Sequence, residues 1–179
     1  MTAFALTPTT GEIRRGAELS ECGRYRYRLW RVWAPSDGSV CWVLLNPSTA
    51  DAETDDPTVR KCMAFAKRWG KGAIEIVNLF AWRATDPKAL LLAERDHDIW
   101  GGMKNEHAVR GAAVNASIVV CGWGGSGGAL GRQWGREVSQ TLREFGVRLQ
   151  CLDVNADGTP AHPLYLPYAA ELVPFRGAA

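Results

Sequence analysis

Polar side chains that could do chemistry follow two apolar segments, one in the first third and one near the end of this sequence. Asn46, Pro47 and Ser48 follow the apolar run 40–45. The amide of Asn46 carries a donor and an acceptor, so it could hold a water molecule or read a base edge, while Pro47 fixes the backbone direction. His162 lies in a loop framed by prolines, where a rigidly held imidazole could donate to a developing anion or exchange a proton near neutral pH.

A second group of such residues accompanies the apolar run 74–80. Asn78 offers another amide, and Phe80 offers a flat surface suited to stacking on an aromatic ring, although core packing explains a lone phenylalanine equally well. Arg83 could pair with a phosphate or with Asp86.

A glycine-rich loop, residues 122–128, follows the apolar run 117–121 and begins with Gly122 and Trp123. Several backbone N–H groups just before a helix can cradle a phosphate or another anion. The loop lacks the G-K-[ST] of a Walker loop and the acidic residue of the dinucleotide fingerprint, so on its own it is a weak signal.

The elements that must position these residues alternate between apolar runs and helical patterns. Strands are predicted at 40–45, 74–80, 117–121 and 147–154, and helices at 57–70, 87–93, 99–116 and 129–145. Strands separated by helices pair in parallel. The predicted fold is therefore α/β, a three-layer α/β/α sandwich around a short, mainly parallel four-stranded sheet. The polar groups would converge at the carboxyl ends of its strands.

The N-terminal part is predicted to add a strand or hairpin to this sheet. Tyr25, Tyr27 and Leu29 alternate with arginines, and the pattern shifts phase at Trp30, which predicts a half-buried strand over 24–33 with a bulge. Residues 1–22 are expected to be a loosely attached arm and 23–179 a single domain.

Composition indicates an ordinary globular protein, with 46% hydrophobic and 22% charged residues among 179. No run approaches the roughly 20 apolar residues of a membrane span and no signal peptide is recognisable, so we expect a cytoplasmic protein, taken as a monomer, with no membrane partner.

Five cysteines without a C-x-x-C pair indicate small core residues, and we expect no metal and no cofactor. A net charge of +2 is too balanced to indicate nucleic-acid binding by itself.

An acidic group, Asp51, Glu53, Asp55 and Asp56, lies near the predicted site. These carboxylates would repel a phosphate backbone, but they could accept from a modified base bearing amines or hydroxyls, or bind Mg²⁺. For Asp56, capping of the following helix is favoured.

The order of the segments LNPS, VNLFAWRATDP, VVCGWG and HPLYL resembles the uracil-DNA glycosylase superfamily. More closely, LLNPSTADAETDDPTVRKC, IVNLFAWRATDP and HPLYLP are similar to an uncharacterised bacterial and phage family of glycosylase-like domains, over about residues 24–175. The resemblance implies that Asn46 positions the attacking water, Phe80 stacks on a flipped base, Asn78 reads its polar edge and His162 stabilises its negative charge. Leu164 would wedge into the base stack. The predicted binding set is completed by Pro47, Ser48, Arg83, Gly122, Trp123 and Tyr165.

The function expected from this resemblance is that of a DNA glycosylase, a DNA-repair hydrolase that flips a damaged, deaminated or modified base into a pocket and cleaves its N-glycosidic bond. Ser48 and Leu164 replace the glycine and serine usual in those motifs. A non-catalytic module that binds a nucleotide or modified base is therefore the alternative. A metal-dependent enzyme using Asp51, Glu53 and Asp55 is a third hypothesis.

Overall fold

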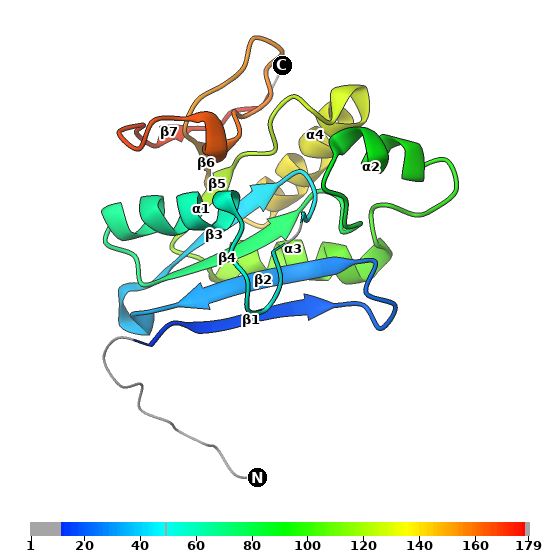
Figure 1. The fold of residues 1–179 in the computed structure, drawn as a ribbon. Coiled ribbons are helices and arrows are strands. Elements are labelled where there is room, and N and C mark those ends of the chain that lie inside the picture. Colours follow the sequence, from blue (N-terminus) through cyan, green and yellow to red (C-terminus); the bar gives the residue numbers. More distant parts are fainter. Residues whose placement is uncertain (1–11, 49, 178–179) are drawn as a thin grey trace.

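The computed structural model describes residues 12–48 and 50–177, which form a seven-stranded sheet with helices on both faces (Figure 1). The strand order is β1-β2-β4-β3-β5-β6-β7. The strands are β1 (Arg14–Leu19), β2 (Arg26–Val32), β3 (Ser39–Leu44), β4 (Ala73–Asn78), β5 (Ile118–Cys121), β6 (Leu149–Cys151) and β7 (Val173–Pro174). The helices are α1 (Pro57–Arg68), α2 (Pro87–Ala93), α3 (Gly102–Asn115) and α4 (Gly128–Glu144), with 3₁₀ turns at Pro35–Asp37 and Pro163–Tyr165.

The sheet is mixed. The neighbours β4, β3, β5 and β6 pair in parallel, whereas β1 with β2, β2 with β4, and β6 with β7 pair antiparallel. The α/β class is confirmed. The four predicted apolar runs form the parallel strands β4, β3, β5 and β6, and β2 lies within the predicted N-terminal strand, but the sheet is larger than predicted, because β1 and β7 extend it to seven strands. A short turn joins β1 to β2, and only an antiparallel pair can be joined in that way.

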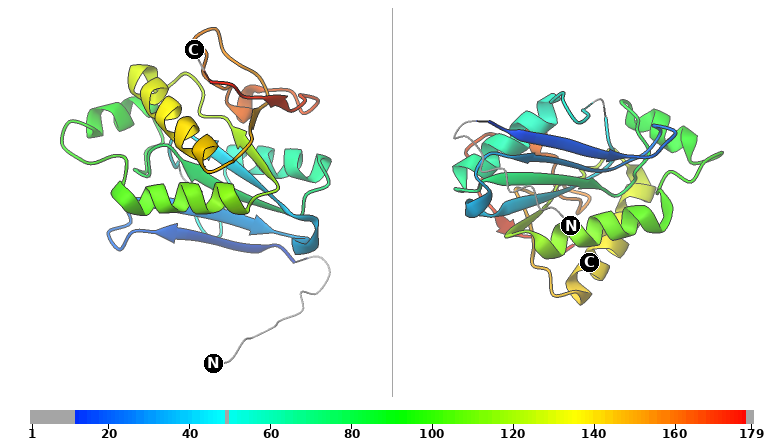
Figure 2. Two further views of the ribbon diagram at one scale, coloured as in Figure 1. Left: turned by 180° about the vertical axis from the view of Figure 1, so that it is seen from behind. Right: turned by 90° about the horizontal axis from the view of Figure 1, so that it is seen from below.

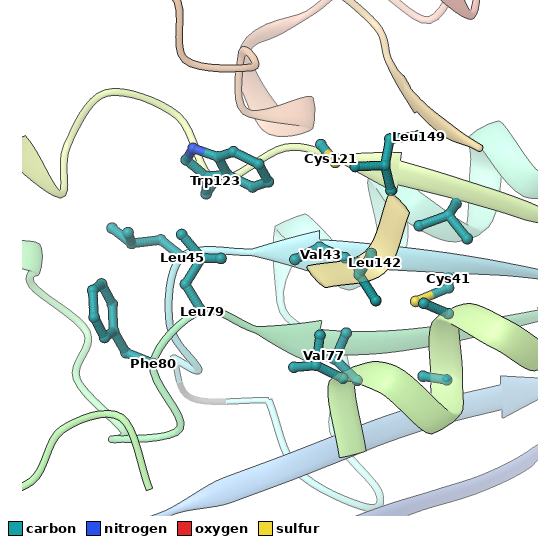
Figure 3. Packing of buried hydrophobic residues seen from close by; sticks show 14 of the residues in the cluster. Cys41, Val43, Leu45, Val77, Leu79, Phe80, Cys121, Trp123, Leu142 and Leu149 are labelled. Atoms are coloured by element: carbon teal, nitrogen blue, oxygen red, sulfur yellow. The ribbon is translucent and has the colours of Figure 1, made fainter. Parts of the chain in front are cut away.

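Two buried clusters fill the space between the sheet and the helices. On β3, Val40, Trp42 and Leu44 face α1, while Cys41 and Val43 face α3 and α4. Figure 2 shows the helices lying on opposite sides of the sheet, and Figure 3 shows the cluster on the α3 and α4 side. Strands covered on both faces require continuous apolar runs, which is why these strands were recognisable in the sequence.

The N-terminal part differs from the prediction. Residues 14–19 of the expected arm form β1, which pairs with β2 along its length, and residues 1–11 lie outside the described part of the chain. The predicted strand does contain an irregularity, but it lies at Tyr27 and not at Trp30, because Glu18 is opposite Arg28 and the next residue, Leu19, is opposite Arg26. The apparent phase shift arises because Arg31, which has no exposed surface, occupies the inward position where an apolar residue was expected.

Helix starts follow the capping signals of the sequence. The Asp56 carboxylate accepts from the N–H of Val59 at 2.8 Å at the start of α1. Asp86 accepts from the N–H of Lys88 at 2.8 Å at the start of α2, rather than pairing with Arg83. Among the described helices, none has the length and apolar character needed to cross a lipid bilayer.

Candidate functional site

A cavity of about 1050 Å³ lies at the carboxyl ends of β3, β5 and β6. The loops that follow these three strands meet there with the N-terminus of α1 and the segment before β7. Six of the predicted site residues line it: Asn46, Ser48, Trp123, His162, Leu164 and Tyr165. The convergence of these loops on one cavity is what the α/β strand order predicts.

The amide of Asn46 is held in one orientation by the backbone. Its Nδ2 donates to the carbonyl oxygens of Ala84 at 2.7 Å and Pro47 at 3.1 Å. Since both amide protons are used in this way, Oδ1 is the atom left to accept a hydrogen bond from a molecule in the cavity. Pro47 itself does not line the cavity and contributes through this carbonyl.

The imidazole of His162 is fixed in one tautomer. Its Nδ1 accepts from the N–H of Leu164 at 3.3 Å, so in the neutral ring the proton is on Nε2. Burial lowers the pKa of His162, and the carboxylate of Asp56 opposes this only in part. The ring is therefore neutral near pH 7, and Nε2 is a donor. The ring of Tyr165, 81% exposed, lies with its centroid 5.7 Å from that of His162.

The glycine loop lets the histidine loop approach closely. A Cβ on Gly124, whose φ is +68°, would lie 3.2 Å from the Cβ of His162. A Cβ on Gly122 would lie 3.0 Å from the Cδ of Pro163. Gly122 therefore supports the loop that carries His162 and does not line the cavity, while Gly124, Gly125 and Ser126 do line it.

The structure does not bring Asn78, Phe80 or Arg83 to the cavity lining. Phe80 belongs to the buried cluster of Figure 3 and has no exposed surface. Its ring packs edge-on against Trp134, with 6.3 Å between ring centroids, so it has no free face for a base. The amide of Asn78 is buried without a partner among the described residues. Arg83 donates to the carbonyl of Gly23 at 3.1 Å.

Tyr165 is the aromatic side chain that the structure places at the cavity with an exposed ring. Trp123 also lines the cavity, but only 3% of it is exposed, and its ring packs edge-on against Phe175 with 5.4 Å between centroids. Stacking on a planar ligand therefore falls to Tyr165.

Comparison with protein families identifies the family to which the chain belongs. A family described as "Protein of unknown function (DUF1643)" matches residues 26–164, which is more than half of the chain. The chain belongs to this family. The match confirms the resemblance to an uncharacterised family seen in the sequence motifs. Neither the curated proteins nor the solved structures gave a significant match, so a link between this DUF1643 chain and the uracil-DNA glycosylases stays a prediction.

Several cavity residues of this DUF1643 protein are not predicted by its sequence motifs. Asn155 and Asp157 follow the carboxyl end of β6, and that position is the signal that could have identified them. Asp56, a member of the acidic group expected near the site and favoured as a helix cap, both caps α1 and lines the cavity. Arg26 lines it as well, with 3% of its surface exposed. An arginine in an alternating strand looks like a solvated residue, so the sequence carries no signal of its burial.

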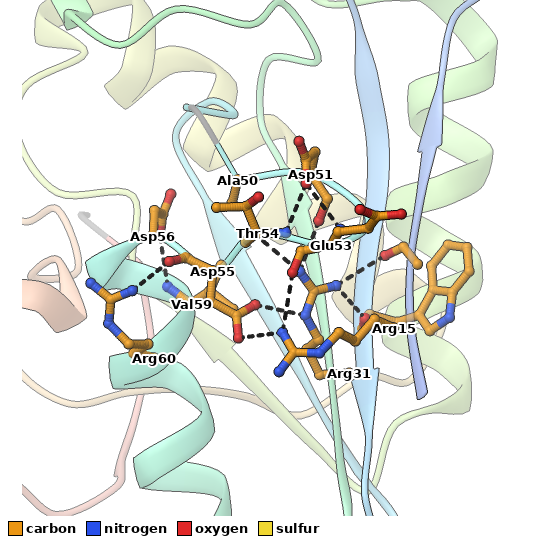
Figure 4. A network of polar contacts seen from close by, with 12 residues as sticks. Arg15, Arg31, Ala50, Asp51, Glu53, Thr54, Asp55, Asp56, Val59 and Arg60 are labelled. Atoms are coloured by element: carbon orange, nitrogen blue, oxygen red, sulfur yellow. Dashed lines mark hydrogen bonds and ion pairs between the residues drawn. The ribbon is translucent and has the colours of Figure 1, made fainter. Parts of the chain in front are cut away.

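The acidic group is largely occupied by protein contacts (Figure 4). Asp55 accepts from Nε of Arg31 and from Nη1 of Arg15, each at 2.7 Å. The carboxylate of Asp51 accepts from the N–H groups of Glu53 and Thr54, and these bonds lower its pKa. Within the described ranges, no three His, Cys, Asp or Glu side chains are grouped as metal ligands.

Proposed function

We propose that the chain binds a nucleobase-bearing ligand in the cavity and hydrolyses its N-glycosidic bond. The observation that carries this proposal is the placement of Asn46 and His162, from distant parts of the chain, on one cavity with complementary free atoms. Oδ1 of Asn46 is an acceptor and Nε2 of His162 is a donor. The motif resemblance to the uracil-DNA glycosylase superfamily supports the same reaction.

The reaction places negative charge on the departing base and positive charge on the sugar carbon. The Nε2–H of neutral His162 can donate to the oxygen on which the negative charge develops. Oδ1 of Asn46 can accept from a water molecule and so orient the lone pair of that water toward the sugar carbon. An amide is not a base at neutral pH, so Asn46 acts by positioning. The carboxylate of Asp56, in the same lining, favours the positive charge on the sugar.

The size and composition of the cavity fit a nucleoside or nucleotide. Pockets for small ligands have volumes of roughly 300–1,000 Å³, which this cavity of about 1050 Å³ matches. The exposed ring of Tyr165 can stack on a base. Asp153 and Asp157 are exposed and line the cavity, and such carboxylates oppose a polyanionic backbone at its mouth. Free nucleosides and nucleotides therefore belong in the test beside DNA, on which a role in repair would depend.

The test is release of free base, measured by chromatography after incubation with nucleosides, nucleotides and oligonucleotides. The oligonucleotides contain uracil, hypoxanthine or hydroxymethylated bases, and alkaline strand scission gives a second readout. His162→Ala and Asn46→Ala should each lower kcat by about 100-fold or more. His107→Ala changes an exposed histidine outside the cavity and should leave the rate unchanged. Absence of base release by the wild-type chain across the panel would contradict the proposal.

The alternative, a non-catalytic binding module, gives a different result with the same ligands. A bound ligand raises the melting temperature with its concentration whether or not it is cleaved. Stabilisation by a base or nucleotide without any base release would favour the binding module, and Tyr165→Ala would then be expected to reduce that stabilisation.

A further inference from the structure

Arg26 is a buried cation that the protein leaves only partly bonded. Its side chain lines the cavity, and 3% of the residue is exposed. Nη1 donates to the carbonyl oxygen of Ala50 at 2.6 Å, while the buried Nε has no partner among the residues that the structure describes. Within residues 12–48 and 50–177, no carboxylate lies within ion-pair distance of this guanidinium.

Arg31, on the same strand, is a buried arginine whose guanidinium is fully hydrogen-bonded by the protein, as expected for a structural role. Its Nε donates to Asp55 at 2.7 Å, and its two Nη atoms donate to the carbonyl oxygens of Gly16, Trp30, Asp51 and Thr54 at 2.7 to 3.4 Å. Arg31 does not line the cavity. Arg26 and Arg31 are thus both buried on the same strand. Arg31 has a carboxylate partner, whereas Arg26, which borders the cavity, has none among the described residues. A buried charge without an anionic partner is strongly unfavourable.

The acidic side chain in the same lining whose charge acts most on Arg26 does not fill this role. Asp56 lines the same cavity, but its Oδ1 accepts from the N–H of Val59 at the start of α1. Burial lowers the pKa of Arg26 to about 10, and the charge of Asp56 opposes this shift without reversing it. Arg26 therefore stays protonated at neutral pH and can bind an anion that enters the cavity.

We propose that the cavity receives the terminal phosphate of a nucleotide and that Arg26 is the residue that binds it. This inference rests on the proposed function for the nucleoside part of the ligand, but it does not require the bond to be cleaved. The planar guanidinium matches the oxygens of a phosphate, and a charge-assisted pair of this kind is among the strongest hydrogen bonds in proteins.

A terminal phosphate fits the position of Arg26 better than a phosphate within a nucleic-acid chain. Arg26 is one of the buried residues of the lining, as are Leu44 and Ile76, while Asp153 and Asp157 lie at exposed positions. A flipped base would enter a pocket with its backbone left outside. A phosphate that reaches a buried arginine must therefore be at the end of the ligand, which indicates a free nucleotide as the substrate class.

Thermal shift with inorganic phosphate tests the anion site without any reaction. At constant ionic strength, phosphate in place of chloride should raise the melting temperature of the wild-type chain, and a nucleoside 5′-monophosphate should raise it more than the matching nucleoside. Arg26→Met should weaken phosphate binding by about 10-fold or more, and Arg26→Lys should retain part of it. Arg28→Met, at a half-buried residue of the same strand that pairs with Glu75 and lies outside the cavity lining, should bind phosphate like the wild type.

The Arg Nε–H resonances of the folded wild-type chain give a second measurement that does not depend on the stability of a variant. The resonance assigned to Arg26 through its loss in Arg26→Lys should shift as phosphate is added, while that of Arg31 should not. Equal phosphate stabilisation of the wild type and Arg26→Met, or an unshifted Arg26 resonance at saturating phosphate, would overturn the proposal. Phosphate binding without any base release would support the phosphate site and contradict the proposed hydrolysis of the N-glycosidic bond.

Discussion

At the scale of single residues, the ion pair between Arg31 and Asp55 joins a fully buried guanidinium to a carboxylate that is itself mostly buried. Arg31 has no exposed side-chain surface, so removing its anion leaves a buried charge alone. We expect Asp55→Asn to lower the free energy of unfolding by about 3–5 kcal/mol in urea denaturation. Glu171→Gln is the matched control, because Glu171 is exposed in its pair with Arg68 and should change stability by less than about 1 kcal/mol. Similar effects of the two substitutions would contradict this assignment.

The same carboxyl group should make stability depend on pH in acid. Burial acts to raise the pKa of Asp55, but hydrogen bonds from Arg31 and Arg15 outweigh it, so the net shift is downward. A carboxyl group with a lower pKa in the folded state stabilises the protein above its ordinary unfolded pKa, and this contribution is lost as the pH falls through the folded value. The stability difference between wild type and Asp55→Asn should therefore shrink below about pH 4. A constant difference from pH 7 to pH 3 would refute the linkage.

The thiol of Cys22 should be the reactive cysteine of the chain. Hydrogen bonding from Ser20, assisted by Arg24, lowers its pKa to about 7, and Cys22 is exposed while the other four cysteines are buried. We expect one thiol per folded chain to react rapidly with iodoacetamide, at a rate that rises to half its maximum near pH 7. Cys22→Ser should abolish this fast phase. Rapid alkylation of a second cysteine in the native protein would contradict the burial of the remaining four.

At the scale of elements, the loop between β5 and α4 positions His162 through its glycines. Gly124→Ala places a Cβ 3.2 Å from the Cβ of His162 and also strains a φ of +68°. Gly146→Ala strains a similar φ of +77° but meets no atom within 4 Å. Backbone strain should lower the free energy of unfolding of both variants by about 1 kcal/mol. The close contact with His162 should lower that of Gly124→Ala further and should shift the His162 imidazole resonances. Equal stability losses with an unchanged His162 spectrum would show that the loops do not touch as described.

The elements themselves could be predicted to different degrees, for physical reasons. Helix α1 was recognisable because Asp56 and Pro57 are strong start signals, and β3 because a strand covered on both faces is continuously apolar. The edge strands β1 and β7 were not recognised. Edge strands are half exposed and short, so their composition resembles that of loops, and their pairing is decided by neighbours that the local sequence does not reveal.

At the scale of the whole molecule, the location of the candidate site could be predicted, because it depends on the order and direction of the strands. Loops after parallel strands must meet at one edge, and that rule brought Asn46 and His162 together. It does not say which way a side chain points, so Phe80 was expected at the cavity although it lies in the core. Nor does it reveal burial of a charge, which is why Arg26 was missed. The orientation of Phe80 and the burial of Arg26 are both set by tertiary packing, which the residue types alone do not reveal.

The segment that carries His162 is anchored to the rest of the molecule at its far end. Between β6 and β7 it crosses α1, where Nη1 of Arg68 donates to the carbonyl oxygens of Tyr168 at 2.7 Å and Ala170 at 2.9 Å. Past β7, Phe175 is buried against Trp123, and its N–H donates to the carbonyl of Leu149 at 2.9 Å. The position of His162 should therefore depend on a phenylalanine outside the cavity lining.

Phe175→Ala tests this dependence. Loss of a buried phenyl ring should lower the free energy of unfolding by about 3–5 kcal/mol. The amide hydrogen-exchange rates of residues 160–172 should also rise more than those of β3, because the contacts of Phe175 that hold the end of this segment against the sheet are lost. Val173→Ala, at a side chain that is 41% exposed, should change either quantity little. If Phe175→Ala destabilises the protein but exchange rises equally in β3 and in 160–172, the anchor acts on global stability alone, and His162 is held in place by its contacts with the glycine loop.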